Sequence, residues 1–439
     1  MNKLLIFGWA IFVALSFKPV HAQFNLDGQL LQRAEFRNGF NRPILESEVP
    51  AKFIAHRARL QASYKMENIS FYMSIQDIRT WGNTPQIKAT DNFLSVHEAW
   101  LETRIAENWL IKLGRQELNY DNFRFLGNLD WALQARAHDF ALVKHEKNDM
   151  KLHFGGGYNQ SEQRLAGVFY DMNNNYKAAQ MIRYENKLGQ FNFSLLFWND
   201  GRQFVVRNSA GTIISEGINY RQTIGLPTIK YQTGNTTVNG FYYHQIGIDN
   251  FGRNVNAFDL SAQITQQINI DQVAGKKLRL VAGFEILSGT PNNVNTENSS
   301  FSPLYGTNHL FNGYMDLFYV GGAHENNVGL QDYYLKGRYD FNPKFFIQAD
   351  VHQFLSQAEV FDQDGLNTLD QNLGTELDFS FGYIFNSAIS LQGGYSQLFY
   401  SDTFASLQNR GNLKDTQNWA YLMLIFRPTM KNRFIGILL

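Results

Sequence analysis

Basic residues recur at alternating positions along the chain, where an extended backbone would place them on one face. The basic residues that we expect on water-facing rows are Arg57, Arg59, Arg79, Arg104, Lys112, Arg115, Arg183, Arg221, Arg279, Lys336 and Arg338. Rows of arginine favour anions, because the guanidinium group is always charged and offers several donors. The pattern predicts a polar, partly anion-selective conduit.

Carboxylates are interspersed among these bases. They are Glu98, Glu102, Glu185, Asp259, Glu285, Asp332, Asp340, Asp350, Glu376 and Asp378. Nearby acids would keep each arginine extended and prevent an anion from binding too tightly to leave. A plainer interpretation is that these residues form mutual ion pairs that only hold the interior together. For any single residue the two interpretations stay open.

Catalytic and metal-binding patterns are weak. His97, His138, His145 and Asp139 could suggest a hydrolase, but no Gly-x-Ser-x-Gly elbow or close Ser/His pairing accompanies them. No histidine pair has metal-ligand spacing with supporting residues, and no glycine motif precedes a helix. We therefore expect no enzyme activity, no metal and no cofactor.

The elements that would position these residues are strands with one polar and one apolar face. Glu98, Trp100, Glu102 and Arg104 alternate with Ala99, Leu101 and Ile105, as the period of two in a β-strand dictates. The segment 344–352 repeats the pattern. A wall with water on one side and lipid on the other explains both faces. Near 113–117 the phase changes, which suggests a bulge.

We count about eighteen strands. They fall near 24–36, 53–66, 69–80, 94–105, 109–118, 139–146, 150–159, 177–187, 190–199, 218–232, 235–246, 255–270, 276–288, 328–341, 344–355, 372–385, 388–399 and 417–427. Short connections rich in Asn, Asp, Gly and Pro alternate with long polar loops. The long loops are 37–52, 81–93, 119–138, 160–176, 200–217, 289–327, 356–371 and 400–416. This alternation of short and long connections predicts an all-β, transmembrane antiparallel barrel with short periplasmic turns and long extracellular loops.

Residues 1–22 have the pattern of a signal peptide. Lys3 precedes an apolar run, and Val20-His21-Ala22 ends in a small residue suited to cleavage. Residues 23–439 then form a single barrel domain, with 428–439 a possible tail that prolongs the barrel or hangs in the periplasm. Aromatics are 15% of the chain, which suits strands and bilayer interfaces. The 39 basic and 39 acidic residues balance, which argues against a nucleic-acid partner.

Several segments resemble the alginate-export family of outer-membrane proteins. They are Gly114–Leu118, Arg124–Gly127, Asp130-Trp131, Arg136 with Asp139, Gln76–Gly82, Glu98–Leu101, Pro303–Gly306, Asn308-His309 and Gly313–Asp316. The resemblance implies a monomeric eighteen-stranded barrel with an arginine-lined pore for an acidic polysaccharide. Within the matching motifs lie Arg79, Arg115, Arg124, Arg136 and Asp139, to which we extend pore and loop contacts.

The sequence thus predicts a channel in the outer membrane of a Gram-negative bacterium. It would passively conduct anionic oligo- or polysaccharides or small anionic solutes, with outer-membrane lipid around it and a possible periplasmic export partner. The loop aromatics Trp81, Tyr120, Phe123, Phe125 and Trp131 could stack on sugar rings, or form an interfacial girdle, or pack a loop against itself. The alternative function is a non-conducting barrel that binds a ligand or partner through its extracellular loops.

Overall fold

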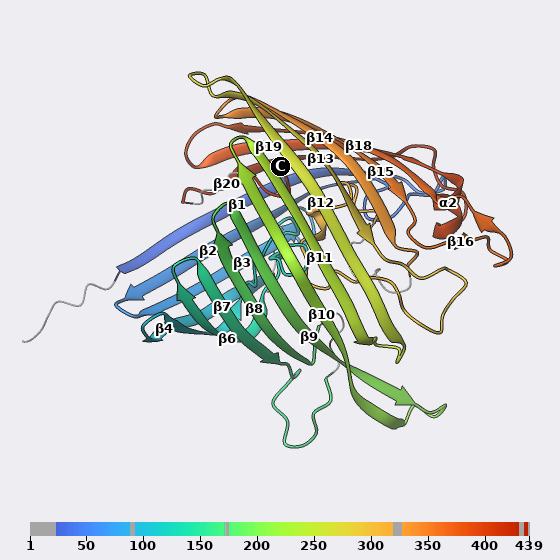
Figure 1. The fold of residues 1–439 in the computed structure, drawn as a ribbon, viewed down its shortest axis with the longest axis horizontal. Helices are drawn as coiled ribbons and strands as arrows, with labels where there is room; N and C mark the ends of the chain where they lie inside the picture. The colour runs from blue at the N-terminus through green and yellow to red at the C-terminus, as the bar shows by residue number, and fades with distance from the viewer. Residues whose placement is uncertain are drawn as a thin grey trace, which may run out of the picture.

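The computed structural model of the chain describes residues 23–87, 93–170, 172, 175–318, 327–429 and 434–437. Eighteen antiparallel strands form one sheet, and the sheet closes because β1 pairs with both β2 and β20. Figure 1 shows the tilted strands of this barrel from the side. The predicted signal peptide lies outside the described residues.

The strands of the barrel match the predicted segments within a few residues at most ends. They are β1 (Gln23–Asn38), β2 (Ala51–Met66), β3 (Ile69–Thr80), β4 (Leu94–Ala106), β5 (Trp109–Gln116), β6 (His138–Lys147), β7 (Met150–Tyr158), β8 (Ala178–Leu188), β9 (Phe191–Arg207), β10 (Ile213–Thr233), β11 (Thr236–Ile248), β12 (Asn254–Asp271), β13 (Lys276–Leu287), β14 (Leu330–Asn342), β15 (Phe345–Leu355), β18 (Asn372–Ile384), β19 (Ile389–Tyr400) and β20 (Gln417–Phe426). The predicted fold is confirmed.

Short turns join the strands at one end of the barrel, and at the other end most of the connections are long. Several of these turns contain a residue with left-handed backbone, among them Asn108 (φ 64°) and Gly189 (φ 62°). Since short turns are periplasmic in outer-membrane barrels, the long loops are extracellular. They carry the hairpin β16 (Val360–Phe361) with β17 (Thr368–Leu369) and the helix α2 (Asp402–Gln408).

The prediction of a long loop at 200–217 is wrong. β9 continues to Arg207 and β10 begins at Ile213, so that only residues 208–212 connect them. The Asn208 side chain accepts hydrogen bonds from the backbone N–H groups of Ala210 and Thr212 and closes this turn. In Figure 1 the paired ends of β9 and β10 project beyond the neighbouring strands at the lower right.

The bulge expected near 113–117 is also absent from the β5 pairings. The register of β5 is unbroken from Leu110 to Arg115 against β4, and from Trp109 to Gln116 against β6. The irregularity lies instead in β4, where Ser74 pairs with Glu98 and Ile75 with Val96, so that His97 is left over.

The two faces of the wall differ as predicted. Leu60, Phe71, Leu101 and Leu422 are exposed on the outer face. Arg57, on the same strand as Leu60 but on its other face, is fully buried on the lumen side. Among the described residues, no helix is long and apolar enough to cross a bilayer.

The lumen is not empty. Residues 117–137, between β5 and β6, and residues 288–318, after β13, fold into it; we call these segments the first and second inner loops. The second contains the 3-10 helix η1 (Asn308–Leu310). A cluster of buried aromatic and aliphatic side chains packs the inner loops against the wall; it includes Phe125, Trp198, Tyr243 and Tyr305. The interior is therefore partly an apolar core.

We expect Leu60→Arg to destabilise the folded barrel by about 2–4 kcal/mol, because Leu60 faces lipid near the middle of β2. The free energy of unfolding in lipid vesicles measures this. Leu188→Arg is the control, since Leu188 is also exposed but lies beside the turn at Gly189, where the cost is about 0–1 kcal/mol. Equal costs at both positions would contradict the assignment of the lipid-facing surface.

Candidate functional site

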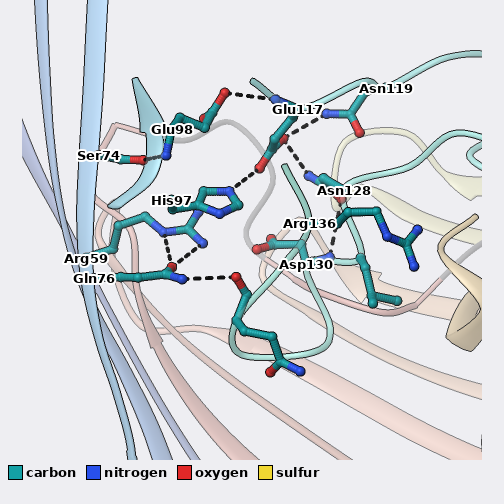
Figure 2. Close-up of polar contacts among 12 residues, drawn as sticks. Arg59, Ser74, Gln76, His97, Glu98, Glu117, Asn119, Asn128, Asp130 and Arg136 are labelled. Carbon is teal, nitrogen blue, oxygen red and sulfur yellow. Dashed lines mark hydrogen bonds and ion pairs between the residues drawn. The ribbon is translucent and has the colours of Figure 1, made fainter. Parts of the chain in front are cut away.

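One sector of the lumen wall is basic. Arg33 on β1, Arg57 and Arg59 on β2, and Arg427, just after β20, are buried on neighbouring strands. Arg57 donates to Gln29 Oε1 (2.7 Å), and Arg59 donates to Gln76 Oε1 (2.7 Å; Figure 2). These strands adjoin one another, so their inward rows place the guanidinium groups on one side of the lumen.

Another sector is acidic. Strands β12 to β15 and β18 are consecutive neighbours in the sheet. Their buried inward carboxylates are Asp259, Glu285, Asp332, Asp340, Asp350, Glu376 and Asp378. His352 Nδ1 contacts Asp332 (2.9 Å), and Lys336 contacts Asp350 (3.6 Å). Acids outnumber bases on this side, so the lumen has two walls of opposite charge.

The first inner loop is bound to both walls. Its Asp130 accepts from Arg57 Nη2 (2.7 Å) and from Arg427 Nη2. Its Arg124 Nε donates to Asp259 Oδ2 (3.2 Å) and forms an ion pair with Glu285 Oε1 (2.7 Å). Burial raises the pKa of Asp130, but the charges of Arg57 and Arg427 outweigh burial and hold the pKa below its ordinary value. Asp130 is therefore ionised at neutral pH, and the pairs persist into acid.

The backbone of this loop is held as well. Leu133 O accepts from Arg57 Nη1 (2.9 Å), Trp131 O accepts from Arg33 Nη1 (2.8 Å), and Gln134 O accepts from Gln76 Nε2 (3.0 Å). Buried carbonyls need such partners, because an unpaired one costs about 1–3 kcal/mol. The arginines of the basic wall thus donate hydrogen bonds to backbone carbonyls of the loop as well as to its carboxylate.

The second inner loop lies against the first. Leu126 and Tyr305 form a parallel bridge, and Trp131 stacks on His309 with ring centroids 4.0 Å apart. His309 in turn contacts Asp316 (2.9 Å). The two loops therefore form one unit across the lumen.

A cavity of about 1100 Å³ lies on the extracellular side of this unit. Its lining includes five arginines, which are Arg33, Arg37, Arg79, Arg136 and Arg202. The carboxylates in its lining are Glu35 and Asp316, and aromatic rings of Phe40, Phe53, Trp131 and Tyr305 also contribute. The cavity combines positive charge with flat apolar surfaces.

Most of these arginines are neutralised by neighbouring carboxylates. Arg33 and Arg37 share Glu35 (2.7 and 2.8 Å), Arg79 pairs with Asp77, and Arg202 pairs with Asp200 (2.8 Å).

Arg136 differs from the other four. Its Nη1 donates to the carbonyls of Gly306 (2.8 Å) and Gly127 (3.4 Å), and it contacts no carboxylate among the residues that the structure describes. Burial lowers its pKa to about 10, so Arg136 stays charged at neutral pH. Arg136 therefore adds uncompensated positive charge to this lining, in addition to the charge left where Arg33 and Arg37 share the single carboxylate of Glu35.

A second cavity, of about 530 Å³, lies against β8 to β14. Its lining includes Arg183, Lys230 and Lys336 as well as the acids Asp121, Glu185, Glu285 and Asp332. Arg183 pairs with Asp121 (2.7 Å) and Glu185 (2.6 Å). This cavity carries both signs of charge and shows no excess of bases.

The C-terminal segment also enters the lumen. Ile435 N–H donates to Gln392 Oε1 (2.9 Å), and Gln392 Nε2 donates to Ile435 O (2.6 Å), on the inner face of β19. A Cβ on Gly436 would lie 2.4 Å from the Trp131 ring and 3.0 Å from that of His309. Residues 434–437 thus pack beneath two rings that line the large cavity, and they neither prolong the barrel nor hang below it.

The predicted site residues fall into distinct groups. Arg79 and Arg136 line the large cavity, and Arg183 lines the smaller one. Arg57 and Arg124 are buried and link the first inner loop to the wall. Arg59 is buried and donates to Gln76, whose amide in turn donates to Gln134 O of that loop. Arg104 is exposed beside the turn after β4, and Arg338 pairs with Asp340 (2.8 Å) near the turn after β14.

Arg115 and Asp139 are not in the lumen. They pair with each other across β5 and β6 (3.1 Å), with 42% and 63% of their side chains exposed. Their neighbours Gln116 and His138 are the buried, inward residues. Because β5 keeps its phase to Gln116, Arg115 faces outward, which corrects its expected inward orientation.

Arg33, Arg37 and Arg202 line the large cavity but were not among the predicted residues. Arg33, Glu35 and Arg37 stand at alternate positions of β1, a signal that the sequence does contain. Arg202 lies within the segment predicted as loop 200–217. Of the loop aromatics, Phe125 and Trp131 are buried and pack the inner loops, and Trp81 is exposed.

Comparisons with known proteins identify solved structures of similar fold. No family model and no curated protein sequence matches the chain. Three similar solved structures come from Pseudomonas aeruginosa. OccK3 (OpdO) has a TM-score of 0.55 at 12% identity, covering 92% of this chain and 95% of its own. OccK9 (OpdG) has a TM-score of 0.56 at 11% identity, covering 92% of this chain and 98% of its own. OpdK, solved with vanillate, has a TM-score of 0.51 at 10% identity, covering 92% of this chain and 98% of its own.

These likenesses show a closed, 18-stranded antiparallel barrel that resembles outer-membrane channels. Together with the apolar exterior they place the protein in an outer membrane. They do not show the alginate-export family.

We expect Asp130→Asn to release the first inner loop. The substitution leaves Arg57 and Arg427 buried without their carboxylate. We expect the free energy of unfolding to fall by roughly 3 kcal/mol, the lower limit of the range for a broken buried ion pair, because 21% of the Asp130 side chain is exposed. Hydrogen–deuterium exchange of residues 123–134 should rise. Asp139→Asn is the control, since its exposed pair is worth less than about 1 kcal/mol. Unchanged exchange in Asp130→Asn would refute the anchoring role.

Proposed function

We propose that the protein is an outer-membrane channel that passively conducts anionic solutes, among which small anions and short anionic saccharides fit best. The large cavity carries this proposal: five arginines line it, and the charge of Arg136 is uncompensated by any described carboxylate. A cleft with a surplus of one charge concentrates counter-ions of the opposite sign. The paired arginines contribute donors without holding an anion too strongly to leave.

The size of the cavity bears on the cargo. About 1100 Å³ is at the upper end of the volumes that hold a drug-sized ligand, roughly 300–1,000 Å³. The rings of Phe40, Phe53 and Trp131 offer faces for a sugar or another flat group. OpdK was solved with vanillate, a small aromatic carboxylate, and such a molecule also suits this lining. Alginate-like polymers remain within the proposal only as short, extended chains.

The contents of the lumen favour a second candidate, a barrel that does not conduct and binds a ligand through its extracellular side. Both inner loops and residues 434–437 occupy the interior. Single-channel recording separates the two candidates. Resolved conductance steps support the channel, and a silent, folded protein supports the binding barrel.

We expect Arg136→Gln to lower the ratio of anion to cation permeability about fivefold. A unit charge about 4 Å from an anion in water-like surroundings contributes about 1 kcal/mol, which corresponds to that factor. Reversal potentials in a salt gradient across a planar bilayer measure the ratio.

Two further variants test this prediction. Arg136→Lys should restore most of the ratio, because it keeps the charge while changing the bonds to Gly306 and Gly127. Arg115→Gln removes an arginine of the outer face and should change nothing. An Arg136→Gln protein with the ratio of the unaltered protein would show that another group sets the selectivity.

A chain that ends at Pro428 should conduct more than the full chain. It keeps β20 to Phe426, together with Arg427 and its pair with Asp130, but loses the segment that lies under Trp131 and His309. Conductance in planar bilayers measures the effect, and the heat-modified mobility of folded barrels in gels verifies folding.

Gln392→Ala tests the same segment without truncation, since it removes both hydrogen bonds to Ile435. It should give an intermediate conductance or more frequent openings. If both variants fold and conduct like the full chain, the C-terminal segment does not obstruct the path.

A further inference from the structure

The β-bulge in β4 brings two consecutive side chains to the lumen side. His97 has no partner in the β3–β4 ladder, whereas Glu98 pairs with Ser74. His97 is buried, with 4% of its surface exposed, and both residues contact the start of the first inner loop. Regular alternation would have placed them on opposite faces, so the bulge re-aims one of them.

Glu117, the first residue after β5, completes a group of three. His97 Nε2 lies 3.0 Å from Glu117 Oε1, and one ligand atom from each of His97, Glu98 and Glu117 lies within 4.8 Å of the other two. Figure 2 shows the three side chains converging between β4 and the inner loop.

Each carboxylate is oriented by hydrogen bonds to one of its oxygens. Glu98 Oε1 accepts from the Glu117 N–H (3.1 Å) and from Trp100 Nε1 (3.1 Å). Glu117 Oε2 accepts from the side-chain amides of Asn119 (2.8 Å) and Asn128 (3.0 Å; Figure 2). Metal-ligating carboxylates are held by such outer partners, which fix the direction of the remaining oxygen.

The remaining oxygens are available to a ligand. Glu117 Oε1 faces His97, and Glu98 Oε2 accepts no hydrogen bond from any residue within the described ranges. The nearby bases have other contacts, since Arg59 donates to Gln76 and Lys112 lies over the Trp100 ring (3.9 Å). Two carboxylates and one imidazole therefore converge with a surplus of negative charge.

We propose that His97, Glu98 and Glu117 bind one first-row transition-metal dication, for which Zn²⁺ is the probe. Imidazole nitrogen suits Zn²⁺ and its neighbours, whereas Ca²⁺ and Mg²⁺ take oxygen ligands. Ligand atoms around tetrahedral Zn²⁺ lie about 3.4 Å apart, given bonds of about 2.1 Å. The three ligand atoms now lie within 4.8 Å of one another, so binding would require side-chain rotations that shorten these separations to about 3.4 Å. The ion would join β4 to the root of the first inner loop.

The test is a Zn²⁺ titration of the full chain in detergent after removal of metals with a chelator. Isothermal titration calorimetry and elemental analysis should give one equivalent. His97→Gln and Glu117→Gln should weaken binding by at least about tenfold. The proposal does not depend on conduction, so its outcome is independent of the channel recordings.

His153→Gln is the matched control. His153 Nε2 also lies 3.0 Å from a glutamate oxygen, that of Glu146, but this pair belongs to no group of three ligands among the described residues. Its loss should leave Zn²⁺ binding unchanged.

Two results would overturn the proposal: no stoichiometric binding by the unaltered chain, or equal binding by a folded His97→Gln chain. In that case His97 only pairs with Glu117. Co²⁺ gives a second measurement that needs no variant. Intense visible absorption of Co²⁺ bound to the unaltered chain supports a site of low coordination number, and the weak bands of hydrated Co²⁺ oppose it.

Discussion

The arrangement of the lumen depends on two ion-pair clusters of opposite polarity at the two ends of one loop segment. Asp130 is held by Arg57 and Arg427 on the basic wall, and Arg124 is held by Asp259 and Glu285 on the acidic wall. Separating the loop from either wall would cost free energy, because the wall would then keep a buried charge without its partner. Six residues apart in sequence, Arg124 and Asp130 fix the loop across the barrel.

This constraint also decides which charges can act on a solute. The arginines that anchor the loop are buried and paired, so they contribute structure and little attraction. In the proposed channel, selectivity would depend on charged groups that the anchoring contacts leave without a counter-charge, and Arg136 is the clearest of these. The rows of bases in the sequence are thus divided by the fold into anchors, such as Arg57, and candidates for contact with a solute. The ion-pair interpretation of the charged rows holds for the anchors, and the conduit interpretation of the other bases stays a proposal.

The strands could be predicted because lipid imposes a strict alternation, and a slip by one residue would bury charges in the bilayer. The same logic failed at Arg115, where a change of phase was inferred but the irregularity lies at His97 in β4. The path of the inner loops could not be predicted, since their polar residues would suit water as well as a lumen. The spacing of Arg33, Glu35 and Arg37, in contrast, was available in the sequence and predicts their common face.

Asp130 has one partner 73 residues away and another 297 residues away along the chain. The second partner, Arg427, follows the strand that seals the cylinder against β1. During folding, the loop can dock fully only after nearly the entire polypeptide has arrived and the first and last strands have met. Contacts of such sequence separation are slow to form. Docking of this loop therefore reports completion of the barrel, and an assembly intermediate would have a mobile interior inside an already formed wall.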